Sequence, residues 1–106
     1  METHWKALRD EMLSRHGDIA TGKMMSSEAL TFGGKVFAFY SAKGAGVGLG
    51  VRLGRDYPFE RLPLTTWSHL APFKTKPPMR DWILVGADDV ERWRDLAEEA
   101  LRVARG

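Results

Sequence analysis

The stretch 77–85 reads Pro-Pro-Met-Arg-Asp-Trp-Ile-Leu-Val and is followed by Gly86. Its aromatic and branched apolar residues predict a strand over Arg80–Val85 that ends at the glycine. The stretch 32–39 reads Phe-Gly-Gly-Lys-Val-Phe-Ala-Phe. Its glycine pair predicts a two-residue hairpin turn, because both glycines can take positive φ without a Cβ clash. A hairpin and a buried strand are therefore the starting points for the fold.

Further strands are predicted around these two stretches. Residues 47–53 alternate Val or Leu with Gly or Arg, which is the period-two pattern of a strand. Residues 35–40 predict an aromatic strand with Phe37 and Phe39 on one face. Weaker extended segments are predicted at 23–25, at 29–32 and, as an edge strand, near 69–74. The short connections favour an antiparallel meander, because parallel neighbours need long crossovers.

Three segments have helical patterns. The first covers 3–16, and its apolar stripe consists of Trp5, Leu8, Met12 and Leu13. A short helix is predicted over 55–62, and a long one begins at Asp88, where Glu91 completes a pattern that resembles a capping box. We therefore expect an α+β fold with the order α-β-β-β-α-β-β-α. It would be a two-layer sandwich in which helices back an antiparallel sheet of about five strands, in a single domain spanning 1–106.

Composition excludes several classes of protein. The 106 residues include no cysteine, which rules out a disulfide framework, a thiolate nucleophile and cysteine-based metal sites. The first residues do not resemble a secretion signal, and the longest fully apolar run, 36–40, is far shorter than the ~20 residues of a membrane helix. We expect a cytoplasmic protein that does not contact a membrane.

Basic residues concentrate in the middle of the chain. Residues 35–80 contain eight Lys or Arg against Asp56 and Glu60, whereas both flanking segments carry a small negative balance. The candidate nucleic-acid or anion-binding residues are Arg52, Arg55, Lys74, Lys76 and Arg80. With Tyr57, Trp67 and Phe73 between them, they could hold a single strand by phosphate contacts and stacking. The alternative interpretation is a solvated sheet rim whose charges discourage edge-to-edge aggregation.

No catalytic motif has a convincing spacing. The glycines of 44–50 match neither of the two common phosphate-binding patterns, and a strand rather than a helix follows them. Ser68 and His69 are adjacent on an extended segment and should point to opposite faces, which is unsuitable for proton sharing. No histidine or acidic pair has metal-ligand spacing. We expect no catalytic residues, metal or cofactor, and we keep Trp67 and His69 as candidates for a pocket.

Several segments together resemble the N-terminal domain of the TfoX (Sxy) family and, more distantly, YjbR/MmcQ proteins. They are Lys23-Met24-Met25, Gly34-Lys35-Val36-Phe37-Ala38, Val47–Leu53, Pro78-Met79-Arg80-Asp81-Trp82 and the helix Asp88–Arg105. Ser26-Ser27 replaces the glycine pair that is usual after the first of these segments. The resemblance implies a secretion-chaperone-like α+β domain without catalytic residues. It also implies a connection to gene regulation.

The leading hypothesis is a non-enzymatic regulatory accessory protein. Its partner would be a protein or, less favoured, a nucleic acid, bound at a face or edge of the sheet. A second hypothesis is a small-molecule or enzymatic pocket within 63–80, where Trp67, His69 and Arg80 are the candidates. A third is a homodimer joined at a sheet edge or a helix face.

Overall fold

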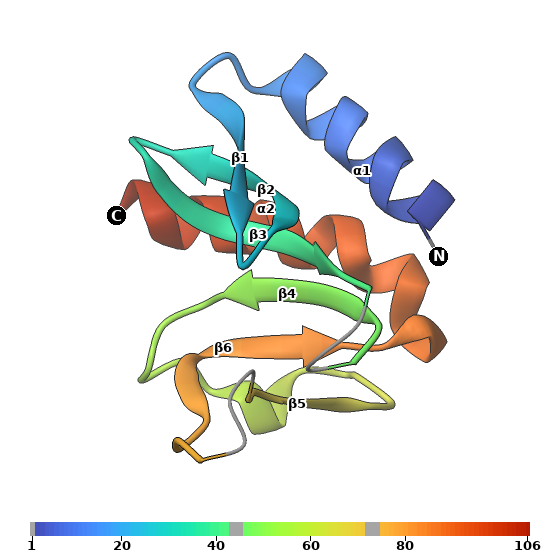
Figure 1. Cartoon of the computed structure of the whole chain (residues 1–106), viewed down its shortest axis with the longest axis vertical. Helices are drawn as coiled ribbons and strands as arrows, with labels where there is room; N and C mark the ends of the chain where they lie inside the picture. Colours follow the sequence, from blue (N-terminus) through green and yellow to red (C-terminus); the bar gives the residue numbers. More distant parts are fainter. Residues whose placement is uncertain (1, 43–45, 72–74) are drawn as a thin grey trace.

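The computed structural model describes residues 2–42, 46–71 and 75–106. It contains helices α1 (Glu2–Arg15) and α2 (Trp93–Arg105) and two short 3-10 segments, η1 (Phe59–Arg61) and η2 (Ala87–Arg92). The strands are β1 (Ile19–Met24), β2 (Ser27–Phe32), β3 (Lys35–Ser41), β4 (Gly48–Arg52), β5 (Trp67–Leu70) and β6 (Met79–Val85). Within the described residues, these six strands form one antiparallel sheet in the order β1-β2-β3-β4-β6-β5 (Figure 1). The strands β1 and β5 are therefore its two edges.

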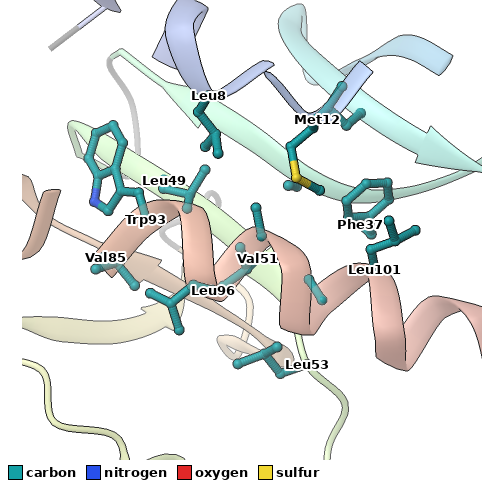
Figure 2. Packing of buried hydrophobic residues seen from close by; sticks show 14 of the residues in the cluster. Leu8, Met12, Phe37, Leu49, Val51, Leu53, Val85, Trp93, Leu96 and Leu101 are labelled. Carbon is teal, nitrogen blue, oxygen red and sulfur yellow. The ribbon is translucent and has the colours of Figure 1, made fainter. Parts of the chain in front are cut away.

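One apolar core fills the space between the sheet and both helices (Figure 2). The helical stripe predicted for α1 is confirmed, because Trp5, Leu8 and Met12 are buried. The buried residues of α2 are Trp93, Leu96, Ala97, Ala100 and Leu101. They lie against sheet residues that include Leu30, Phe37, Leu49, Val51, Ile83 and Val85. The predicted α+β fold is thus confirmed as two terminal helices on an open antiparallel sheet.

A smaller apolar cluster lies on the opposite face of the sheet and consists of Ala29, Phe39, Leu70 and Trp82. The ladder between β2 and β3 is bulged, since Leu30 pairs with Ala38 whereas Thr31 pairs with Val36. The extra residue, Phe37, lies in the main core, while Phe39 belongs to the opposite cluster. The prediction that Phe37 and Phe39 share one face is therefore wrong.

The two glycines of β4 make room for neighbouring groups. The Phe39 ring lies over Gly50, where an added Cβ would overlap the ring, and the Val85 carbonyl lies against Gly48. Phe39 also makes an edge-to-face contact with Trp82, at a centroid distance of 5.5 Å. The expectation that these glycines admit a bulky neighbour or another backbone is confirmed.

Two tight hairpins build the first half of the sheet. The turn between β2 and β3 has the predicted glycine pair, Gly33 and Gly34, with φ of 58° and 82°. The turn between β1 and β2 has the same handedness but contains Met25 and Ser26, with φ of 50° and 71°. A strand was predicted over 23–25, whereas Met25 belongs to the turn and the strand begins earlier, at Ile19.

The helix predictions need two corrections. The helix expected over 55–62 is only the short segment η1. Within the described residues the sheet has six strands rather than about five, so two terminal helices enclose six strands and the predicted order α-β-β-β-α-β-β-α is wrong. The C-terminal α-helix begins at Trp93, not at Asp88, because Asp89 has non-helical φ and ψ of −113° and 24°. The carboxylate of Asp89 instead accepts hydrogen bonds from the backbone N–H groups of Thr65 and Thr66. The acidic residues at 88 and 91 predict a local helix cap, and nothing in that pattern indicates a contact with residues 65 and 66.

The edge strand predicted near 69–74 is found as β5, and residues 72–74 lie outside the described part. Among the described residues, no helix combines the length and apolarity needed to span a bilayer.

Candidate functional site

Antiparallel pairing brings cationic residues of β3, β4, β6 and the segment after β4 to one end of the sheet. The first residues of β3 and β6 and the last residues of β4 lie at this end, and so does the C-terminus of α2 (Figure 1). We define the basic end as Lys35, Arg52, Arg55 and Arg80. Of the other candidates, Lys76 precedes β6 at the same end, and Lys74 lies outside the described residues.

Three members of the basic end have no counter-charge among the described residues. Lys35, Arg55 and Arg80 are exposed, and in the described part of the chain none of them forms an ion pair. Arg52 donates from Nη2 to Oδ2 of Asp81 at 3.1 Å, and both side chains remain largely exposed. An exposed pair of this kind contributes little to stability. The basic end can therefore meet an anion without first breaking a strong internal contact.

A hollow of about 280 Å³ opens beside this charge. Its lining comprises Phe32, Gly33, Lys35, Val36, Phe37, Arg52, Val103 and Ala104. Its charged groups are Lys35 and Arg52, while the other side chains that line it are apolar. The hollow can therefore accept an anionic group attached to an apolar body. Lys35 was not among the candidates, although its position directly after the glycine turn placed it at a strand terminus.

The cations of α2 at the same end of the sheet are already neutralised. Arg105 donates to both carboxylate oxygens of Asp18, at 3.0 and 2.8 Å, and this hydrogen bonding lowers the pKa of Asp18. Arg102 donates to both oxygens of Glu99 and lowers the pKa of that carboxyl group. Arg105 thus ties the end of α2 to the segment before β1, whereas the Arg102–Glu99 pair lies within α2, and neither arginine adds free charge to the basic end.

The pocket candidates Trp67 and His69 lie elsewhere, on β5. Both rings pack against Phe59, with centroid distances of 5.7 Å and 5.0 Å, and against each other at 5.5 Å. The Nδ1 atom of His69 lies 3.1 Å from the Trp82 carbonyl oxygen. His69 is thus half-buried in an aromatic cluster. Ser68 is exposed and lies opposite Leu84, away from that cluster, as the strand alternation predicted.

A separate hollow of about 220 Å³ reaches Trp67 but not His69. Its lining consists of Gly46, Val47, Thr66, Trp67, Ser68, Leu84 and Gly86. No titratable side chain lines it, so it offers no acid or base for chemistry. Arg80 also lies outside this lining, and the structure does not bring the three pocket candidates together.

Few aromatic rings are available for stacking in the described structure. Trp82 and Phe39 are buried in the cluster on the far face. Tyr57 is half-buried and donates its hydroxyl to Glu99 at 2.7 Å. Burial, together with this hydrogen bond, raises the pKa of Tyr57 to about 12. Phe73 lies outside the described residues.

Asp89 is a buried carboxylate with a structural role. It is 4% exposed and accepts hydrogen bonds of 2.9 Å from the N–H groups of Thr65 and Thr66, which lowers its pKa. Among the described residues, no three His, Cys, Asp or Glu side chains gather where they could hold a metal ion.

Comparison with protein-family models, curated proteins and solved structures finds no match for this chain. The fold defines an α+β domain with an open antiparallel sheet that carries two terminal helices. The resemblance to TfoX-like domains stays a prediction.

Proposed function

We propose that this protein is a non-enzymatic binding domain, a regulatory accessory protein of the TfoX-like kind, whose basic end contacts an acidic segment of a partner protein. The observation that carries the proposal is the cluster of Lys35, Arg55 and Arg80, three exposed cations that form no ion pair with any described residue, beside Arg52 and the hollow. Charge of one sign on a surface steers association with partners of the opposite sign.

An acidic protein segment fits this end better than a nucleic acid does. Single-stranded binding relies on exposed rings on which bases stack, and the described aromatic residues near the sheet are buried or engaged. The hollow, in contrast, has apolar walls from Val36, Phe37 and Val103 with cations at its rim. A side chain or chain terminus that joins an apolar group to a carboxylate matches both features.

The test is fluorescence anisotropy with labelled peptides that combine acidic and apolar residues, at low and near-physiological salt. We expect binding that weakens as salt rises and that is lost in the triple variant Lys35→Ala/Arg55→Ala/Arg80→Ala. The control Lys6→Ala/Arg61→Ala/Arg94→Ala removes the same charge at exposed positions outside the basic end and should keep the affinity. An equal loss in both variants would show only a response to net charge and would contradict the proposal.

Nucleic acid is the second candidate, favoured by the same cations, and the same assay examines it. Labelled single- and double-stranded DNA replace the peptides. Duplex binding with a steep salt dependence, together with no peptide binding, would assign the basic end to phosphate contacts instead. No binding of any probe at low salt would remove the basic end as the contact surface.

A further inference from the structure

We infer that the free edge of β1 pairs with β1 of a second copy, so that two sheets join across a two-fold axis centred on Thr21. This inference concerns another surface than the basic end and does not depend on the proposed function. It starts from the direction of the main-chain groups along β1, a strand that pairs with β2 on one side only.

Alternate residues of β1 direct their N–H and C=O groups away from β2. The two-residue turn makes Met24 and Ser27 a hydrogen-bonded pair, and such pairs recur at every second residue along an antiparallel ladder. Consistent with this, the hydroxyl of Thr31 donates to the Ala20 carbonyl oxygen at 3.3 Å, so that this carbonyl points inward. The groups of Ile19, Thr21 and Lys23 therefore point outward.

Of the sequence and register features that protect an edge strand from pairing, β1 has only one lysine. Its six residues pair with β2 in an unbroken register and include no proline. Ala20, Thr21 and Gly22 have small side chains and are exposed or half-exposed, so a neighbouring strand can approach to the ordinary ~4.8 Å. An open, regular edge of this length is a template for pairing with another chain.

The opposite edge of the sheet is different. The strand β5 has four residues, and its register shifts between His69 and Leu70. Pro63 precedes it in the sequence, and Pro72 follows it. A short, irregular edge flanked by proline is a poor template. Pairing at β1 alone gives a closed, isologous dimer and not a fibre.

A second copy is favoured over an unrelated strand because β1 is complementary to itself. Among the symmetric registers that pair outward residues with outward residues, only the one centred on Thr21 brings all three outward residues of β1 into pairs. Lys23 then lies opposite Ile19 of the other copy, next in sequence to its Asp18. Lys23 is exposed and forms no ion pair in the described structure, while the Asp18 side chain is 46% exposed.

Lys23 and Asp18 lie on the same face of the sheet. Lys23 lies opposite Glu28, whose carboxylate contacts Trp5 and Arg9 of α1, and Asp18 is held by Arg105 of α2. Both are therefore on the helix-bearing face. A two-fold axis perpendicular to the sheet keeps that face common to the two copies, so the contact between Lys23 of one copy and Asp18 of the other forms twice in the dimer.

The test is sedimentation equilibrium of the full chain across the micromolar range, with Thr21→Pro as the main variant. Proline removes only an outward N–H at residue 21 and leaves the ladder to β2 intact. We expect a dimer whose dissociation constant rises at least about tenfold in Thr21→Pro, because each copy loses one hydrogen bond. The control Thr21→Val keeps the N–H group and a branched side chain, and should keep the dimer.

Two further measurements make the assignment specific. Amide exchange of Thr21 and Lys23 should slow as the protein concentration rises, while circular dichroism confirms that the variants fold. Lys23→Glu places a carboxylate beside the opposing Asp18 and should weaken the dimer, more strongly at low salt. A monomer throughout the range, or a dimer that Thr21→Pro leaves unchanged, would overturn the inference.

Discussion

Asp89 illustrates how one side chain can organise a segment distant in sequence. Its backbone departs from helical geometry within η2, and its carboxylate accepts hydrogen bonds from the backbone N–H groups of Thr65 and Thr66, just before β5. These two donors precede the edge strand and would otherwise need water or another acceptor. The position of β5 beside β6 therefore depends partly on an acid that the sequence places in the helix.

The substitution Asp89→Asn tests this role through pH. The hydrogen bonds from Thr66 and Thr65 hold the pKa of Asp89 below its ordinary value. A depressed pKa contributes stability above the unfolded-state pKa, and this contribution is lost as pH falls through the folded-state pKa. We expect Asp89→Asn to lower the free energy of unfolding at pH 7 and to flatten its decline below about pH 4.

The measurement is urea unfolding followed from pH 7 down to the acid limit. The control is Asp88→Asn, the same substitution at the neighbouring exposed residue, which accepts no hydrogen bond in the described structure. If both variants kept the wild-type pH profile, the carboxylate of Asp89 would not have the proposed role. The sequence alone favoured Asp88, because capping patterns describe local contacts only.

At the scale of elements, the two hairpins solve the same geometric problem with different residues. Gly33 and Gly34 adopt positive φ without cost, and the glycine pair made this turn predictable. Met25 and Ser26 also have positive φ, although each has a side chain. This left-handed conformation costs about 1 kcal/mol or more of conformational energy for each residue. The turn-prone pair Ser26-Ser27 indicates a turn one residue later than the structure has it, so the strand predicted over 23–25 extends into the turn.

We expect Met25→Asn/Ser26→Gly to stabilise the protein by about 1 kcal/mol, because Asn-Gly is the preferred pair in such turns. Chemical unfolding of wild type and variant measures the difference. The same residues introduced one position outward, as Met24→Asn/Ser27→Gly, enter the paired strands and should destabilise. A variant turn that is no more stable than the wild type would mean that Met25 and Ser26 gain compensating contacts.

Periodicity predicted most elements, but not the irregularities that direct their side chains. The stripe of α1 is visible because one face of the helix is buried, and the alternation of β4 is visible because Leu49 and Val51 enter the main core while Gly50 lies under the Phe39 ring. The β3 bulge is not visible, since an extra aromatic residue in an aromatic strand leaves no break in the pattern. For the basic end, the positive charge of 35–80 is predictable from composition, but the clustering of its residues is not, because it depends on the order of β3, β4 and β6.

At the scale of the whole molecule, both helices and the sheet share one core. The rings of Trp5 on α1 and Trp93 on α2 both pack against the ring of Tyr40 on β3, at centroid distances of 6.3 and 6.5 Å. Leu101 of α2 is fully buried in the same cluster as Met12 and Phe37 (Figure 2). Because neither helix has a core of its own in the described structure, they should not unfold separately.

This arrangement predicts the effect of Leu101→Ala. Removing a fully buried leucine leaves a cavity and should lower the free energy of unfolding by about 2–5 kcal/mol. Leu13 is only half-buried at the margin of the same core, so its replacement by alanine should lower the free energy of unfolding by less. Unfolding should remain a single transition, with tryptophan fluorescence and far-ultraviolet circular dichroism giving the same midpoint. Separate midpoints would show that one helix detaches before the sheet unfolds and would contradict a shared core.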